Sequence, residues 1–107
     1  MKQRKLYRQG DVLIEIVQSI PASAKKQKKS QPIVLAHGEA TGHHHAIKDR
    51  DSADWWKEGD DVQYVEAKKP TPIVHEEHDP IPLKRGEIAR ITRQKEYTPT
   101  AIVRVAD

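Results

Sequence analysis

All six histidines of the chain lie in two short segments, and imidazole is the side chain best suited here to bind a metal ion or to move a proton near neutral pH. Residues 37–45 contain four of them, and residues 75–78 contain the other two beside a pair of glutamates. Neutral imidazole and carboxylate groups bind zinc, nickel, iron and manganese, and three or four such donors hold one ion. If folding brings the two segments together, the sequence predicts a site for a divalent metal ion of this group.

His43 and His45 have the most favourable spacing for two ligands of one ion. On a strand, side chains two residues apart project from the same face at about 6–7 Å, so one ion can reach both rings. His44 then faces the other way and is expected to be structural or exposed to solvent. His37 is a further candidate ligand, because it forms with Glu39 a second pair of donors two residues apart.

The second segment is expected to supply the third ligand, and its spacing leaves open which residue does so. If it is extended, His75 and Glu77 face opposite to Glu76 and His78, so only one histidine joins the first pair. A turn before Asp79-Pro80 would let both histidines converge. We favour His78, which lies next to this bend, with His75 as the alternative. Glu76 or Glu77 is expected to be a fourth ligand or the base that deprotonates a metal-bound water.

A glycine followed by His43-x-His45 and a later His78 resembles the cupin family, whose small β-barrels hold a metal with three histidines and a glutamate. The resemblance covers residues 38–45 and His78, and it implies a metal centre inside a small barrel. The chain departs from the family where a glutamate should follow His45, because Asp49 stands there. The family's second motif, Pro-x-Gly followed by a histidine, is missing.

The Gly-Glu-x-Thr-Gly-His run at residues 38–43 is also similar to a motif of short uncharacterised bacterial proteins. Those proteins have a later histidine and an Arg/Lys-Glu-Tyr ending, which residues 93–97 match. This likeness implies no function.

The elements that position these residues are expected to be strands. Apolar and β-branched residues occur in short runs broken by Gly and Pro, and no long stretch free of both carries apolar residues at helical spacing. We therefore expect an all-β fold over residues 1–107, a single small barrel or sandwich of about seven short antiparallel strands. The clearest candidate strands are residues 12–17, 33–36, 43–47, 62–67, 88–97 and 101–105.

The composition limits the chemistry of the site. The chain has no cysteine, so nitrogen and oxygen must hold any metal, which fits a reducing compartment. The apolar run at residues 12–17 is short and broken by Glu15, so neither a signal peptide nor a membrane span is predicted. We expect a cytoplasmic protein with no membrane partner.

A lysine-rich stretch at residues 22–31 has no apolar periodicity and is expected to be an exposed, mobile loop. The net charge of +3 allows weak attraction to nucleic acid without implying strong binding. The neighbouring tryptophans, Trp55 and Trp56, are expected to pack on the core. The candidate contacts to nucleic acid are Lys25, Lys26, Lys28, Lys29, Arg90 and Arg93.

Three functions are compatible with these residues. The first is a metal-binding protein that is a hydrolase or nuclease acting on a phosphodiester. The second is a metal-independent ribonuclease in which two histidines serve as base and acid, with basic residues steadying the phosphate. The third is a non-enzymatic module that binds protein or nucleic acid through the lysine-rich stretch and the tryptophans.

Overall fold

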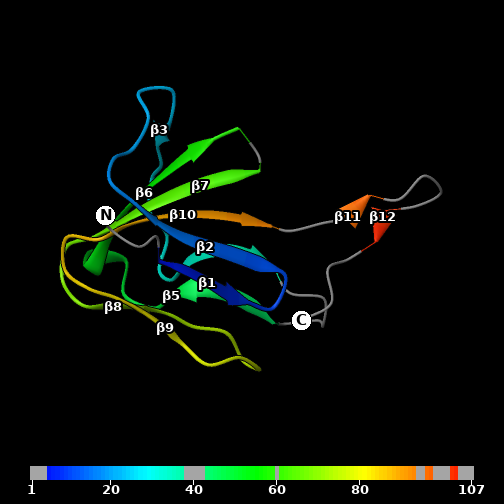
Figure 1. Cartoon of the computed structure of the whole chain (residues 1–107). Coiled ribbons are helices and arrows are strands. Elements are labelled where there is room, and N and C mark those ends of the chain that lie inside the picture. The colour runs from blue at the N-terminus through cyan, green and yellow to red at the C-terminus, as the bar shows by residue number, and fades with distance from the viewer. Residues whose placement is uncertain (1–4, 38–42, 60, 94–95, 98–101, 104–107) are drawn as a thin grey trace.

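A computed structural model describes residues 5–37, 43–59, 61–93, 96–97 and 102–103, and these are built almost entirely of antiparallel strands (Figure 1). The prediction of an all-β fold is confirmed. Six strands form one sheet in the order β1-β2-β10-β7-β6-β3. Because β1 and β3 are edges, the sheet is not closed into a barrel. Its strands are β1 (Leu6–Gln9), β2 (Val12–Val17), β3 (Lys25–Lys26), β6 (Ala53–Glu58), β7 (Val62–Ala67) and β10 (Ile88–Arg93).

Four shorter strands cover one face of this sheet and lie below it in Figure 1. Strands β4 (Ile33–His37) and β5 (His44–Ile47) pair with each other, and so do β8 (Thr71–Ile73) and β9 (Ile81–Leu83). Ala46 and Val74 join the two pairs by exchanging backbone hydrogen bonds of 2.9 Å in both directions. The result is a two-layer sandwich. The remaining elements are the 3-10 turn η1 (Arg50–Ser52) and the hairpin of β11 (Glu96–Tyr97) and β12 (Ile102–Val103).

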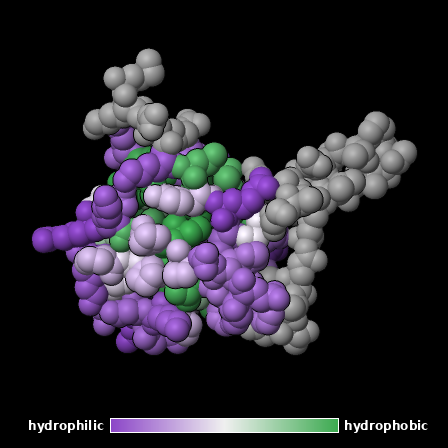
Figure 2. All heavy atoms as spheres, turned by 60° about the horizontal axis from the view of Figure 1, so that its bottom comes forward, coloured by the Kyte–Doolittle hydropathy of each residue, from purple (hydrophilic) through white to green (hydrophobic). Residues whose placement is uncertain are grey.

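The core lies between the two layers and follows the alternation of the strands. In β2, Val12 and Ile14 are buried; in β10, Ile91 is buried opposite Ile14 and Ala89 is buried opposite Ile16. One face of the molecule is mostly hydrophilic, with a smaller group of apolar residues in its middle (Figure 2). The layer of shorter strands contributes further residues to the buried core between the layers: Ile33, Leu35, Ile47, Ile73, Ile81 and Leu83.

Three strands of the large sheet, β1, β3 and β6, were not expected from the sequence. β6 runs through the polar stretch around the tryptophans, where the alternation is hidden because Lys57 shares the face of Trp55 and Trp56 lies between Asp54 and Glu58 on the other face. Trp55 packs against the core and donates from Nε1 to Gln63, as expected, whereas Trp56 lies on the opposite face of β6. β1 is short and polar, and it forms because Gly10 turns the chain back onto β2 with φ at +61°.

The lysine-rich stretch is not a loop throughout. Lys25 and Lys26 form β3 against β6. Lys29 Nζ lies 2.8 Å from the carbonyl oxygen of Ala53 and 3.1 Å from Asp54 Oδ1, so this cation belongs to the folded body. The predicted strands at residues 88–97 and 101–105 lie partly outside the described residues. Residues 38–42 lie wholly outside them. No helix in the described ranges has the length and apolarity needed to cross a membrane.

The Asp54 carboxylate makes stability depend on pH. Burial raises the pKa of Asp54, but hydrogen bonds from Lys68 and Lys29 outweigh it and hold the pKa below the usual 3.8. The stabilisation is therefore present above pH 4 and is lost as pH falls through the lowered value. We expect Asp54→Asn to lower the unfolding free energy at pH 7 by about 1–2 kcal/mol, with the difference from the parent shrinking below pH 4. Urea unfolding of the parent and the variant, at pH 7 and below pH 4, measures this difference in unfolding free energy.

The exposed Asp51→Asn is the matched control and should change stability by less than about 0.5 kcal/mol. Equal losses for both variants at every pH would contradict the role given to Asp54.

Candidate histidine site

The site is centred on His45, which is 1% exposed although it is polar. Its place follows from the alternation of β5, which turns His45 and Ile47 toward the core. A register shift between Val34 and Ala36 leaves Ala36 opposite His45. A buried imidazole needs partners for its ring nitrogens, and the first of these comes from β1.

Gln9 determines which nitrogen of His45 carries the proton. The Gln9 amide is also 1% exposed, and its Nε2 donates to the carbonyl oxygens of Ile73 at 2.9 Å and Asp79 at 3.0 Å. Its Oε1 is therefore the atom that faces His45 Nδ1, at 2.8 Å. Because Oε1 only accepts, Nδ1 must donate, and the neutral ring keeps its lone pair on Nε2.

The nitrogen that carries this lone pair lies near a carboxylate. His45 Nε2 lies 3.8 Å from Asp11 Oδ1, a separation too long for a hydrogen bond. The other oxygen of Asp11, Oδ2, is 3.2 Å from Arg93 Nε. Asp11 therefore stands between an imidazole and a guanidinium, with both carboxylate oxygens directed into the site.

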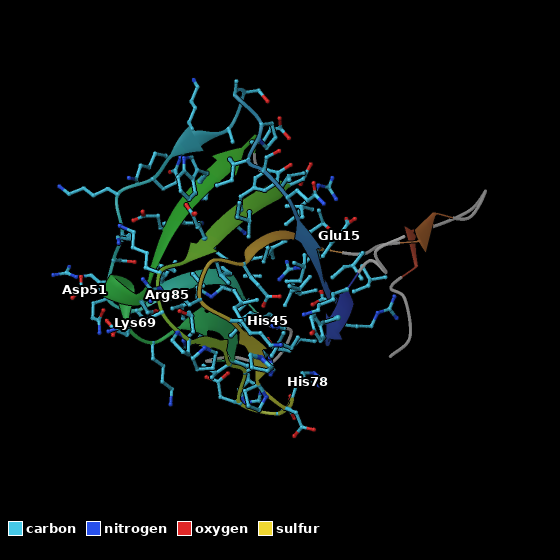
Figure 3. All side chains as sticks on the ribbon, turned by 60° about the vertical axis from the view of Figure 1, so that its left-hand side comes forward. Glu15, His45, Asp51, Lys69, His78 and Arg85 are labelled. Carbon is cyan, nitrogen blue, oxygen red and sulfur yellow. The ribbon has the colours of Figure 1, made fainter. Side chains whose placement is uncertain are left out.

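The structure brings four histidines from the two predicted segments together. His75 is central: its ring centroid is 4.4 Å from that of His45, 4.8 Å from that of His78 and 5.7 Å from that of His43. Figure 3 shows His45 and His78 near each other at the lower end of the molecule. Residues about thirty positions apart thus converge on one side of the sandwich.

Gly10 allows His78 to reach this place. A Cβ built on Gly10 would lie 2.9 Å from His78 Nε2 and 3.5 Å from His45 Cε1, so any side chain there would displace the ring of His78. Glycine also suits the positive φ of this turn.

Glu76 and Glu77 make hydrogen bonds to the histidine segments. Glu77 Oε1 is 3.0 Å from His43 Nδ1, and the Glu77 amide donates to His75 Nδ1 at 3.0 Å. Neutral His75 therefore carries its proton on Nε2. Glu76 accepts from the backbone amide of His44 at 2.9 Å. This hydrogen bond is the main cause of the lowered pKa of Glu76.

The cluster favours uncharged imidazoles. Burial, reinforced by His75, lowers the pKa of His45 to about 4 against the opposing effect of Asp11. Burial, followed by the neighbouring His78, also lowers the pKa of His75. Uncharged rings keep the lone pairs that a metal ion needs. In the described residues as they stand, no group of three or more His, Asp or Glu side chains is arranged to hold an ion.

Other predicted residues lie elsewhere. The ring of His37 is 6.4 Å from that of His44, and its carbonyl oxygen accepts a hydrogen bond from Arg93. Arg90 pairs with Glu15 at 3.8 Å on the opposite face of the large sheet. The lysines of β3 lie at the edge opposite β1, about 24 Å away by strand spacing. Glu39 and the Gly-rich turn lie outside the described residues.

The sequence analysis missed three residues of the site, the consecutive Gln9, Gly10 and Asp11. One signal was available in the sequence: polar residues on both sides of a glycine lead directly into a strongly apolar strand. In the structure both of these polar residues are buried.

Residues 8–94 match a protein family described as a domain of unknown function (DUF8820). This range includes every residue of the site. No curated protein and no solved structure matches the chain.

The bond to Gln9 predicts the tautomer of His45. In the metal-free protein at pH 7, ¹⁵N NMR should show a protonated Nδ1 and an unprotonated Nε2. Gln9→Ala should lower the unfolding free energy by about 2–4 kcal/mol, because buried His45 Nδ1, the Ile73 carbonyl oxygen and the partly buried Asp79 carbonyl oxygen lose their partner.

Gln27→Ala is the control. In the described residues the Gln27 side chain bonds to the nearby Lys25 carbonyl, and its backbone bond to Trp55 survives the substitution, so the change should cost less than about 0.5 kcal/mol. A proton on Nε2 of His45 at pH 7 would contradict the assignment.

Proposed function

The chain belongs to the DUF8820 family, which carries no assigned function, and we propose from its site that the protein binds a divalent transition-metal ion through His45, Asp11 and His78. The observation that carries the proposal is the 3.8 Å between His45 Nε2 and Asp11 Oδ1. Zinc bonds to an imidazole nitrogen and a carboxylate oxygen add up to roughly 4.0–4.3 Å. One ion between the two atoms therefore contacts both without either residue moving.

His78 is the third ligand in this proposal because its Nε2 lies against Gly10, beside His45. The side chain is exposed, so it can rotate toward an ion at low cost. His43 and His75 are the further donors. His75 becomes a ligand through Nε2 only after its Nδ1 releases the Glu77 amide and takes the proton.

Hydrogen bonds around the ligands support the proposal. Metal-binding histidines usually donate their second ring N–H to an amide, carbonyl or carboxylate, which orients the ring. Gln9 does this for His45, and Glu77 is placed to do it for His43. Glu77 therefore suits the role of an orienting residue, and Glu76 remains a candidate base.

A metal site explains the buried histidine better than the alternatives do. A general acid or base for neutral pH has its pKa near 7, whereas the pKa of His45 is about 4. The nucleic-acid module depends on free cations, but Lys26 and Lys29 are paired with Asp54 at 3.8 and 3.1 Å. When bound, the ion would lower the pKa of a coordinated water toward about 7, which makes hydrolysis the reaction class to test first.

Protein purified without a tag and without nickel-affinity chromatography should bind zinc or nickel at one site in a calorimetric titration. Asp11→Asn and His78→Ala should each weaken binding by more than the 10–100-fold typical of an orienting partner. His37→Ala should leave the affinity unchanged. Parent protein that takes up neither metal at micromolar concentration would rule the proposal out.

Two glycines provide a matched pair of variants. Gly10→Ala and Gly59→Ala both place alanine at a positive φ, +61° and +71°, so both should lose about 1 kcal/mol of stability. At Gly10 the new Cβ meets His78, whereas at Gly59 no atom of the described residues lies within 4 Å of the new Cβ. We expect Gly10→Ala alone to weaken zinc binding, by tenfold or more. Equal zinc affinity in the two variants would argue against His78 as a ligand.

A further inference from the structure

A second feature, next to the histidine site, is a cleft between β4 and the large sheet. Its volume of about 580 Å³ is in the range of small-molecule sites. It opens where β4 diverges from β10 and β7. Its lining residues are Val12, Leu35, Ala36, His37, Asp61, Val62, Gln63, Ile91, Thr92 and Arg93.

The cleft has an apolar floor and a charged rim. Val12, Leu35 and Ile91 are buried core residues at the bottom of the cleft, and half-buried Ala36 adds accessible apolar surface beside them. Arg93, on the core-facing side of β10, is an exposed cation at its rim. This combination fits a molecule with an apolar body and a negatively charged end, because the two parts need different surroundings.

Arg93 is held in position from both layers. Its Nε lies 3.2 Å from Asp11 Oδ2, and its Nη2 donates to the carbonyl oxygen of His37 on β4. The guanidinium has five N–H donors in a rigid fork, and these two contacts account for two of them. A fork fixed in this way is preorganised to bind a carboxylate or a phosphate.

Asp11 connects the cleft to the metal site. One of its oxygens faces His45 and the other faces Arg93, so the same carboxylate serves both. If the proposed site held an ion on Oδ1, Asp11 would interact less strongly with Arg93, and Arg93 would then attract an anion in the cleft more strongly.

We propose that the cleft binds a small organic anion, with its carboxylate or phosphate on Arg93 and its apolar body against Ala36 and the edge of Leu35, and that metal binding tightens this interaction. The second part rests on the proposed metal-binding function. By linkage, the anion strengthens metal binding by the same factor. The head group would be one carboxylate away from the ion, so the substrate class for the proposed hydrolysis is a small anion. The distant lysines of β3 then have no part in it.

The test uses three probes of similar body: benzoate, phenyl phosphate and neutral benzyl alcohol. Each is titrated into the full chain by NMR, first without zinc and then with one equivalent. We expect at least one anion to bind tenfold or more tightly than the alcohol, and to bind more tightly still with zinc. Binding of one anion alone identifies the head group. Anions that bind no better than benzyl alcohol in both conditions would overturn the proposal.

Arginine variants separate the cleft from the metal. Arg93→Gln should weaken anion binding tenfold or more without zinc, and Arg93→Lys should restore part of it while keeping the ion pair with Asp11. Arg90→Gln is the control, because Arg90 lies on the same strand but on the opposite face. Undiminished anion binding in Arg93→Gln would refute the assignment.

The two proposals fail in different ways. If zinc does not bind but the anions do, the metal site and the coupling are wrong and the anion site stands. If zinc binds but neither anion exceeds the alcohol, the cleft proposal is wrong and the metal site stands.

Discussion

The buried amide of Gln9 is the constraint on which the site depends. It donates to two carbonyl oxygens, of Ile73 and Asp79, and accepts from His45. These three hydrogen bonds connect β1, β5 and the segment that carries the second histidine cluster. Because the bonds to Ile73 and His45 are buried and the one to Asp79 is partly buried, breaking a buried bond leaves a polar atom without water, and the arrangement is therefore cooperative.

A series of polar contacts leads from this amide to the cleft. Gln9 leaves the lone pair of His45 on Nε2, which lies near Asp11. Asp11 pairs with Arg93, and Arg93 donates to the carbonyl oxygen of His37 in the other layer. The turn at Gly10 makes this possible, since it reverses the chain between Gln9 and Asp11 without a side chain that would displace His78. A metal site and an anion site that share one carboxylate would influence each other through charge alone, with no large movement of the sheet.

Strands whose apolar residues alternate clearly were predictable, because the period of two is a property of the chain itself. β7 and β10 are of this kind, β2 and β4 are short runs rich in apolar residues, and the all-β fold followed from these strands. β6 was not predictable, because its stability comes from Trp55 packing on the core and from pairing with two neighbours, and neither is visible in its charged sequence. The ordering of Lys26 and Lys29 was not predictable either, because their partner Asp54 is distant from them along the chain.

The sequence alone determined the fold class and the residue types available to the site: six histidines in two groups and no cysteine. The tertiary structure decided which of these residues meet. His75 lies at the centre of the site, and His37 lies at the neighbouring cleft. Gln9, Gly10 and Asp11 also belong to the site, although no histidine pattern indicates them. The physical reason is that strand alternation tells which face a side chain occupies, whereas the strand it lies beside depends on the pairing of distant segments.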